Sequence, residues 1–294
     1  MKIERAVSLA RLTTLGTGGP ARAFAQPETV DELQAALVWA REEGVPAEVV
    51  GLGSNLLVAD AGVDALVVRL AGGLATVELA GERILAGGGA ANAVVLHRAR
   101  AAGLGGFEFA CAIPGTIGGG VKMNAGAYGS DFSQVLVEAV VVDADGARTC
   151  TPAQLGLSYR HSELRRGQVV ARATLGLHPR PSEEIKAEVK ALNGQRKATQ
   201  PTNKRTFGSV FKNPDHELGA GRMLEACGLK GYRLGGAVVS PRHANFIENA
   251  GGATSADAIA LMVEARRRAF ERFGVRLEPE VQFLGPLELP PVGG

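Results

Sequence analysis

Hydrophobic residues recur at helical spacing in five segments of the chain. In the first, a capping sequence, Thr29 to Glu32, precedes Leu33, Ala36, Leu37 and Ala40 at helical spacing, and Gly44 ends the pattern. Glycines also end the second, fourth and fifth patterns, as is typical of helix C-termini. Of the other four predicted helices, one covers about residues 92–102 and one begins at Ser182. The last two cover residues 220–227 and the segment from the capping residue Ser255 to Gly274.

Short runs rich in β-branched residues alternate with these helices and predict strands. Several of them follow one another in the middle of the chain, so a regular alternation of strand and helix fails there. Asp143-Ala144-Asp145-Gly146 is typical of a hairpin turn. We therefore expect an α+β fold rather than a doubly wound sheet. The predicted strands are 47–50, 65–70, 75–79, 83–86, 135–143, 169–177, 209–212, 244–248 and 281–284.

Composition narrows the class of protein. The 294 residues include 32 basic and 30 acidic side chains, and a net charge of +2 gives no reason to expect nucleic acid or a membrane surface as a partner. The three cysteines are too few and too scattered for a disulfide framework, and the charged start, Lys2 to Arg5, lacks the apolar run of a signal peptide. No run reaches the roughly 18 apolar residues of a transmembrane helix. We expect a cytoplasmic protein.

Glycine is unusually frequent, at 40 residues, and two loops concentrate it. One is Gly51–Asn55, directly after a predicted strand; the other is Ile113–Gly120, which Asn124–Gly129 follows. A pyrophosphate needs several backbone N–H donors, and residues without bulky side chains let the backbone come close to it. From the residues alone, a nucleotide site and a pair of tight turns both fit. The five histidines make no metal-ligand pair, and we expect no metal.

Seven separated motifs follow one another along the chain. They are Gly51–Leu57, Ile113–Gly129, Tyr159–Ser162, Gly208–Pro214, Ala220–Gly231, His243–Ile247 and Leu277–Val281. In this order they resemble the UDP-N-acetylenolpyruvoylglucosamine reductase (MurB) family. The resemblance covers roughly Thr13 to Gly285, and the lack of a tyrosine between Tyr159 and Tyr232 matches the shorter subclass without a tyrosine-bearing loop. A departure is Leu12, where the family often has asparagine.

The resemblance implies an FAD-binding fold of the PCMH/MurB type in two subdomains, followed by a C-terminal α+β substrate-binding lobe. We expect residues 1–62 and 63–180 to enclose a noncovalent FAD and residues 196–287 to bind substrate. The implied reaction passes a hydride from NADPH to the flavin and then to UDP-N-acetylglucosamine enolpyruvate, giving UDP-N-acetylmuramate for peptidoglycan synthesis. The expected partners are these small molecules, with no nucleic acid or membrane, and we expect a monomer.

Three catalytic residues follow from the resemblance. Arg160 would stabilise the negative charge that hydride addition leaves on the substrate carboxylate, because a guanidinium is always charged and pairs with carboxylates. Ser209 would donate a proton to the neighbouring carbon, and Glu280 would donate a hydrogen bond to the enolate-like intermediate. Glu280 is preferred to Glu278 because the family's glutamate directly precedes a valine. Without the resemblance, these are an ordinary surface arginine, a strand hydroxyl and a strand-edge carboxylate.

The resemblance also implies binding residues. Tyr128 and Asn213 would contact the substrate. Lys204, Arg205 and Arg242 are candidates to replace the missing tyrosine loop over the diphosphate. The residues expected to hold FAD are Gly51, Gly53, Ser54, Asn55, Gly115, Gly119, Asn124 and Gly126.

Two other functions remain open from the sequence. The first is another FAD enzyme of the same fold, such as an oxidase or dehydrogenase of small alcohols, which would turn over with oxygen and ignore NADPH. The second is a binder of nucleotide sugars or flavin without catalysis, in which replacing Ser209 would change only affinity.

Overall fold

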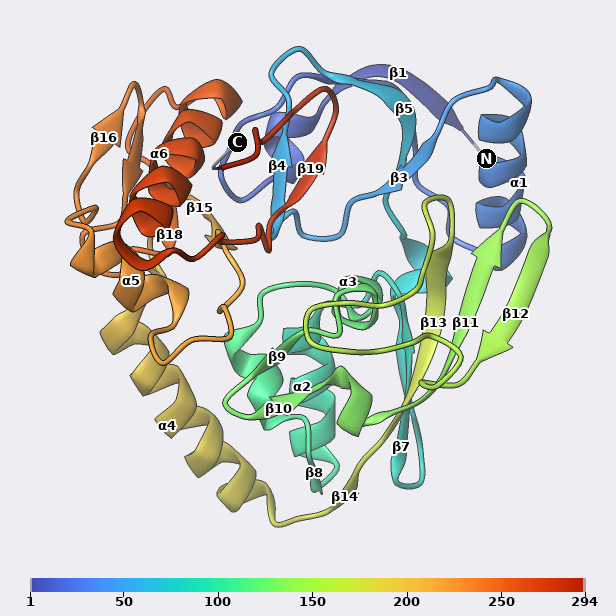
Figure 1. The fold of residues 1–294 in the computed structure, drawn as a ribbon. Helices are drawn as coiled ribbons and strands as arrows, with labels where there is room; N and C mark the ends of the chain where they lie inside the picture. The colour runs from blue at the N-terminus through green and yellow to red at the C-terminus, as the bar shows by residue number, and fades with distance from the viewer. Residues whose placement is uncertain (1, 293–294) are drawn as a thin grey trace. The chain divides into compact units, whose positions relative to one another are not determined.

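The computed structural model describes residues 2–292, and it has the expected α+β composition (Figure 1). The chain divides into two compact units, each assembled from segments distant in sequence. Unit 1 contains the chain up to Arg5, Ala23–Leu52 and Asp64–Arg196; unit 2 contains Ala6–Arg22, Gly53–Val63 and the chain from Lys197 onward. The division into three parts at 62/63 and 180–196 stays a prediction.

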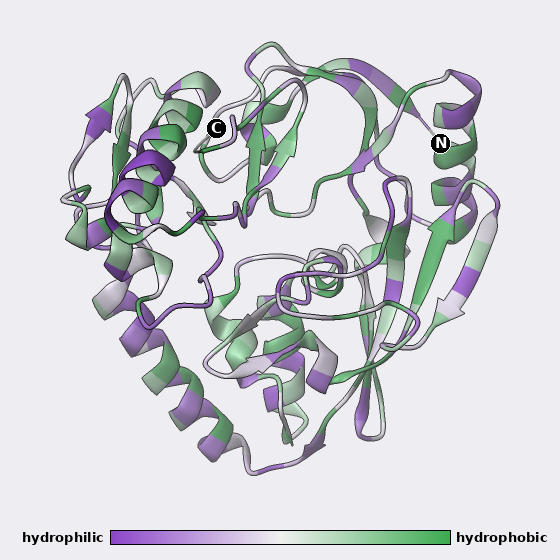
Figure 2. Cartoon of the chain, viewed as in Figure 1, coloured by the Kyte–Doolittle hydropathy of each residue, from purple (hydrophilic) through white to green (hydrophobic). Residues whose placement is uncertain are grey.

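Unit 1 is built around a five-stranded antiparallel sheet in the order β12-β11-β13-β7-β6. The predicted hairpin turn is confirmed, because Asp143 at the end of β11 pairs with Gly146 at the start of β12. In Figure 2 the arrow of β11 is mostly green, in keeping with its run of valines. The strands are β6 (Val77–Ala80), β7 (Arg83–Gly87), β11 (Leu136–Asp143), β12 (Gly146–Cys150) and β13 (Val169–Gly176).

The helices of unit 1 cover its apolar surfaces. Thr29 caps α1 (Val30–Glu42) by accepting a hydrogen bond from the Glu32 N–H. Three phenylalanine rings, Phe107, Phe109 and Phe132, meet edge to face in the core beneath α2 and α3. The remaining helices are α2 (Asn92–Ala101), α3 (Ile117–Lys122) and α4 (Ser182–Thr199), whose last three residues belong to unit 2.

A second sheet has the order β1-β2-β5-β3, and the residues of β1, β2 and β5 are each divided between the two units. Its unit 1 part packs on α1 through Leu33 and Leu37, which are buried. Two short pairs complete unit 1: β8 (Leu104–Gly105) with β14 (His178–Pro179), and β9 (Gly126–Ala127) with β10 (Ser130–Asp131). The sheet consists of β1 (Ile3–Ser8), β2 (Pro20–Ala25), β3 (Ala47–Val49) and β5 (Val63–Val68).

Unit 2 contains a four-stranded antiparallel sheet with α6 (Ser255–Phe273) packed beside β16 and β17 (Figure 1). Thr254 and Asp257 form a complete capping box at the start of α6, and Gly274 ends it in the left-handed conformation. A parallel pair, β4 (Leu56–Val58) with β19 (Gln282–Leu284), lies in the same unit. The sheet and its other helix are β15 (Thr206–Ser209), β16 (Arg233–Leu234), β17 (Ala237–Val239), β18 (Phe246–Asn249) and α5 (Ala220–Ala226).

Several predicted elements were wrong in detail. The loop Ile113–Gly120 contains a helix, α3, that the sequence analysis missed because three successive glycines disfavour a helix. The helix predicted from Ser182 is confirmed, and α4 continues to Thr199 through good helix formers. The capping residue of α6 is Thr254 rather than Ser255. The predicted strand 209–212 is also displaced, because β15 ends at Ser209.

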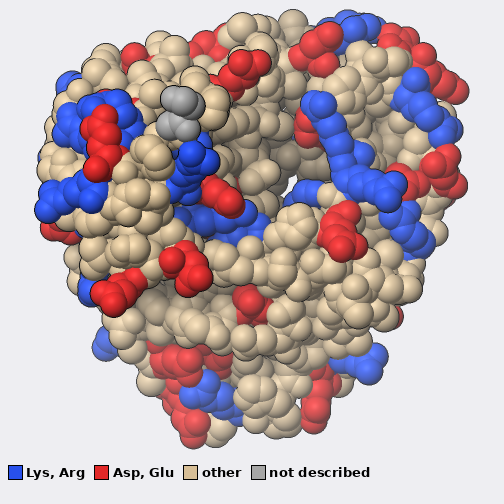
Figure 3. All heavy atoms as spheres, in the orientation of Figure 1, with Lys and Arg blue, Asp and Glu red and all other residues tan. Residues whose placement is uncertain are grey.

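The surface agrees with a nearly neutral protein. On the face drawn in Figure 3, basic and acidic side chains both lie among uncharged ones, and neither sign covers the face. Within residues 2–292, the helices are either too short or too polar to cross a membrane.

Candidate active site

Ser209 and Glu280 are neighbours in unit 2. β15 ends at Ser209 after a register shift against β18, at which Gly208 has a φ of +81°. The backbone then continues beside the segment that precedes β19: the Glu280 N–H donates to the Val210 carbonyl, and the Lys212 N–H donates to the Glu278 carbonyl, both at 2.9 Å. The structure therefore brings together two of the three predicted catalytic residues by main-chain bonds alone.

The two glutamates near this point differ in their surroundings. Glu278 has a side chain that is 74% exposed, and it forms an ion pair with Lys212 at 3.5 Å. Glu280 is half-buried. No strand covers residues 278–280, so the two side chains do not share a strand face. The burial favours Glu280 as the carboxyl that faces a site sheltered from water.

The end of the first glycine loop reaches the same place. The Asn55 side chain donates a hydrogen bond from Nδ2 to the Glu280 carbonyl at 3.1 Å, and the Gln282 N–H donates to the Asn55 carbonyl at 3.0 Å. A Cβ on Gly208 would lie 3.2 Å from the Ser54 carbonyl oxygen. Three motifs far apart in the sequence thus converge on Ser209 and Glu280.

Gly53 is required at its position by the fold itself. Its φ is +65°, and a Cβ there would lie 1.9 Å from the Leu12 carbonyl oxygen. Thr14, a residue to which the sequence analysis gave no role, fixes this contact: its N–H donates to the Gly53 carbonyl at 3.1 Å, and its hydroxyl donates to the Thr206 carbonyl at 2.6 Å. Thr14 therefore links the glycine loop to β15.

In unit 1, the start of the first glycine loop lies against the second. A Cβ on Gly51 would lie 2.6 Å from Thr116 Oγ1. Thr116 caps α3 by accepting a hydrogen bond from the Gly119 N–H. Because Gly51 packs directly on the cap of α3, the two loops that were recognised separately form one surface.

Arg160 is tied to the second glycine loop in unit 1. Its guanidinium donates from Nη2 to the Gly126 carbonyl at 2.6 Å and lies 4.9 Å from the centre of the Tyr159 ring. Its φ is +54°, in the left-handed region that residues other than glycine rarely adopt. Asn124, with a φ of +38°, is buried and donates to the Ser158 carbonyl at 3.0 Å. The residues of the Tyr159–Ser162 motif are thus held against the loop.

Known proteins match this arrangement over most of the chain. Residues 200–284 match the C-terminal domain of UDP-N-acetylenolpyruvoylglucosamine reductase, and residues 21–151 match an FAD-binding domain. A UDP-N-acetylenolpyruvoylglucosamine reductase of Symbiobacterium thermophilum is 44% identical over 97% of this chain and 92% of its own length. The reductase of Rubrobacter xylanophilus is also 44% identical, over 94% of this chain and 93% of its own. The chain belongs to the UDP-N-acetylenolpyruvoylglucosamine reductase (MurB) family.

A solved structure of the same family matches this chain in its fold as well as in its sequence. The crystal structure of MurB from Thermus caldophilus is 39% identical, covers 97% of this chain and 99% of its own, and superposes with a TM-score of 0.85. The expected fold of the MurB type, with an FAD-binding domain followed by a MurB C-terminal domain, is confirmed. This member of the MurB family is an FAD-dependent oxidoreductase.

The second glycine loop fits a cofactor at one position in particular. A Cβ on Gly119 would meet only Thr116 Oγ1, at 3.6 Å, among the described atoms beyond its own helix backbone. At Gly126 and Gly120, by contrast, a Cβ would strike Ser130 and the Phe132 ring. The latter glycines are needed for packing within the chain. Gly119 instead leaves backbone uncovered, which suits the close approach of a flavin nucleotide to this MurB chain.

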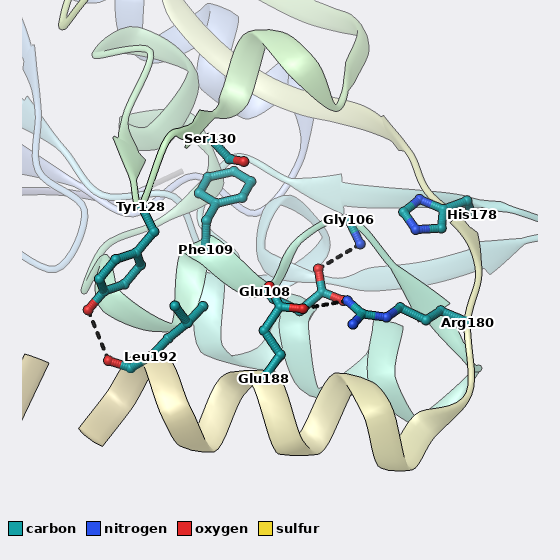
Figure 4. Close-up of a pocket in the computed structure, with 9 residues that line it drawn as sticks. All are labelled: Gly106, Glu108, Phe109, Tyr128, Ser130, His178, Arg180, Glu188 and Leu192. Atoms are coloured by element: carbon teal, nitrogen blue, oxygen red, sulfur yellow. Dashed lines mark hydrogen bonds and ion pairs between the residues drawn. The ribbon is translucent and has the colours of Figure 1, made fainter. Parts of the chain in front are cut away.

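Tyr128, a predicted substrate contact, lines a pocket beneath α4 (Figure 4). Its hydroxyl donates to the Leu192 carbonyl at 2.9 Å, and burial raises its pKa. Across the pocket, Arg180 pairs with the buried Glu108 at 3.0 Å and with Glu188 at 2.6 Å. Three charged side chains of the pocket are therefore paired with one another, and the Tyr128 hydroxyl is bound to α4.

Two other expected contacts are occupied by the chain itself. Asn213, predicted to touch substrate, accepts a hydrogen bond at Oδ1 from the Ala220 N–H at the start of α5, at 3.1 Å. Arg242, a candidate for the diphosphate, donates from Nη1 to the Lys197 carbonyl in the last turn of α4, at 2.6 Å. Both side chains therefore have structural partners in this MurB chain, and their roles toward substrate stay predictions.

Asn245 is the residue beside the site that the sequence analysis missed. It is buried, with 4% of its surface exposed, and its side chain bonds both polar groups of the Phe211 backbone. Next to it, burial lowers the pKa of His243, and the neutral imidazole accepts the Asn245 N–H at Nδ1 at 3.2 Å. The available signal was an amide placed between Ala244 and Phe246 in a strongly apolar run.

Proposed function

We propose that this chain reduces the enolpyruvyl group of UDP-N-acetylglucosamine enolpyruvate with NADPH, giving UDP-N-acetylmuramate. In balance, the carbon–carbon double bond gains a hydride and a proton, and NADPH becomes NADP⁺. FAD, when bound, would supply the hydride-transfer chemistry. The substrate is proposed because the relatives named above are reductases of this compound. A cytoplasmic location is part of the proposal. So is noncovalent binding of FAD, since neither glycine loop contains histidine or cysteine.

The single observation that carries the chemistry is that the Glu280 backbone bonds to Val210, the residue directly after Ser209. Hydride addition to the methylene carbon leaves an enolate that extends onto the substrate carboxylate, and the next carbon must then be protonated. A hydroxyl and a carboxyl at one site would meet two needs, a proton donor and a hydrogen-bond donor to the enolate. The Glu280–Val210 bond supports this assignment because it sets both residues at one point of unit 2.

Arg160 would act on the negative charge. A guanidinium presents a fixed fork of donors, so it can bind the carboxylate of the substrate and stabilise the charge that develops there. Its bond to the Gly126 carbonyl and its contact with the Tyr159 ring restrict its rotamers before substrate arrives. This pre-organisation supports an electrostatic role, since a donor already oriented costs no reorganisation during the reaction.

An anaerobic visible spectrum tests the proposal. The purified flavoprotein is titrated with NADPH and then with UDP-N-acetylglucosamine enolpyruvate. We expect the flavin absorbance to bleach with NADPH and to return when the sugar nucleotide is added. Bleaching without return would retain an FAD enzyme and reject this substrate. Acid precipitation of the protein, which should release the yellow colour to the supernatant, checks that the flavin is noncovalent.

A further inference from the structure

Next to the proposed catalytic serine, the side chain of Asn245 makes hydrogen bonds of the kind that the backbone of a neighbouring strand would make. The pairing of β15 with β18 ends at the pair formed by Ser209 and Phe246. There the Val210 N–H donates to the Asn245 carbonyl at 2.9 Å. The Phe211 N–H donates to Asn245 Oδ1 at 3.0 Å, and Asn245 Nδ2 donates to the Phe211 carbonyl at 2.8 Å. A carboxamide reproduces a peptide group in these bonds, with one acceptor and one donor.

The segment that carries Ser209 is consequently held along both edges. On one edge lie the main chain and side chain of Asn245; on the other lie the bonds from Glu280 to Val210 and from Lys212 to Glu278. Losing the amide would leave two buried polar groups of Phe211 unpaired on one edge only. The backbone after Ser209 would then be free to shift while its contact with Glu280 remains.

A second asparagine, Asn249 at the end of β18, gives a measure of an ordinary structural role. Asn249 also uses both atoms of its side-chain amide: Nδ2 donates to the Leu15 carbonyl, and Oδ1 accepts from the Gly251 and Ala253 N–H groups. These partners are loop backbone, and none belongs to the Ser209 segment. Asn245 directly precedes β18 and Asn249 ends it, so the two residues offer the same chemistry at different distances from Ser209, which pairs with Phe246.

We propose that Asn245 is a positioning residue that holds the Ser209 hydroxyl in its proton-donating place; this rests on the function proposed above. Asn245 acts on the backbone of Phe211 and needs no contact with substrate or flavin. Its removal should therefore slow the step that uses the serine proton and spare the step that does not. Reduction of the flavin by NADPH does not use that proton, so the two half-reactions separate the effects.

The experiment compares Asn245→Ala, Asn245→Asp and the control Asn249→Ala by anaerobic stopped flow, with urea unfolding measured on each. For Asn245→Ala we expect reoxidation by the enolpyruvyl substrate to slow at least tenfold, while reduction by NADPH stays within twofold of wild type. Asn249→Ala should lose stability and keep both rates. In Asn245→Asp a protonated carboxyl can donate and accept as the amide does, so its reoxidation rate relative to wild type should rise as pH falls.

Three results would overturn the proposal. The first is unchanged reoxidation in Asn245→Ala; the second is an equal fall of both half-reactions. The third is failure of both Asn245 variants to retain flavin while Asn249→Ala retains it, which would make Asn245 a requirement of folding. Wild-type protein that NADPH reduces but the sugar nucleotide does not reoxidise would instead reject the function proposed above, so the two failures are distinguishable.

Discussion

Glu280 and Val210 are joined by a main-chain hydrogen bond of 2.9 Å across a sequence separation that places them in different motifs. Val210 directly follows Ser209, so this bond places the backbone of Glu280 next to that of the proposed proton donor. Because only backbone atoms take part, replacing either side chain leaves the bond in place. Variants of Ser209 and Glu280 should therefore report on chemistry rather than on a rearranged site.

Replacing Ser209 with alanine should separate the two half-reactions. The variant loses the hydroxyl and retains the backbone bonds on both sides, so binding of flavin should persist. We expect reoxidation by UDP-N-acetylglucosamine enolpyruvate to slow by about 10²–10⁴, the usual contribution of a general acid. Flavin reduction by NADPH should stay within about twofold, because it needs no proton from this residue. Anaerobic stopped-flow absorbance measures both rates.

Ser255→Ala is the matched control for this prediction. Ser255 is a buried serine of unit 2 whose hydroxyl donates to Asp60 Oδ2 at 2.7 Å, away from Ser209. Its loss should lower the free energy of unfolding by about 1 kcal/mol and leave both half-reactions intact. Equal rates of reoxidation in Ser209→Ala and Ser255→Ala would remove Ser209 from the mechanism.

Replacing Arg160 with lysine tests the geometry of the guanidinium rather than its charge. Lysine keeps one positive charge but loses the fork of donors and the bond to the Gly126 carbonyl. We expect reoxidation to slow by about 10², as on removal of one preorganised donor, with weaker binding of the enolpyruvyl substrate. Arg148→Lys, at an exposed ion pair with Asp143 on the β11–β12 hairpin, should change neither rate. Comparable effects of the two substitutions would argue against Arg160.

The helices of this chain could be predicted from sequence more reliably than its site. Periodicity and capping residues located α1, α2, α4, α5 and α6, because a helix is specified by contacts within one segment. β2 was missed since its sequence, P-A-R-A-F-A, holds no β-branched residue, and its strand character comes from the sheet around it. Strands such as β2 form because they pair with other segments of the folded chain, and the sequence of one segment does not encode that pairing.

The site also has residues that the sequence predicted and contacts that only the folded structure reveals. The motifs named Ser209, Glu280 and Arg160, but the bond from Asn55 to the Glu280 carbonyl depends on a contact between residues distant in the chain. The role of Asn245 was invisible for a related reason: an amide that replaces a strand edge has no periodic pattern. Glycine content was noticed correctly, yet Gly53 proved to be demanded by the Leu12 carbonyl rather than by open space for a ligand.

Replacing Gly119 with alanine should weaken flavin binding without weakening the fold. A Cβ there would meet only Thr116 Oγ1 at 3.6 Å, so the protein has room for it, whereas a cofactor against this backbone would not. Alanine also favours a helix over glycine. We expect FAD affinity to fall about tenfold, at roughly 1.4 kcal/mol, with an unchanged or higher free energy of unfolding of the apoprotein. Flavin titration of the apoprotein measures the affinity.

Gly194→Ala provides the control for Gly119→Ala. Gly194 lies within α4 in the same unit, and a Cβ there would meet nothing within 4 Å. It should raise helix stability by a similar amount and leave FAD affinity unchanged. If Gly119→Ala also binds FAD as tightly as wild type, the open backbone of α3 is not part of the cofactor site.

The stability of α6 should depend on pH through Glu264. Hydrogen bonds from Arg267 and then Arg268, at 2.8 and 2.6 Å, outweigh the opposing effect of burial and lower the pKa of Glu264 from 4.5 to about 2. A carboxyl whose pKa is lower in the folded state stabilises the fold above pH 4.5, and this stabilisation is lost as pH falls toward 2. Glu264→Gln should therefore lower the free energy of unfolding by about 0.5–1 kcal/mol at pH 7, in the range of partly exposed ion pairs. Urea unfolding at pH 7 and pH 2.5 should show the difference from wild type shrinking at the lower pH.

Glu271→Gln is the control, because Glu271 also pairs with Arg267 but has a side chain that is 56% exposed, against 19% for Glu264. This substitution should have a smaller effect on the free energy of unfolding at pH 7. A Glu264→Gln difference that persists unchanged at pH 2.5 would show that packing, and not the ionised pair, accounts for it.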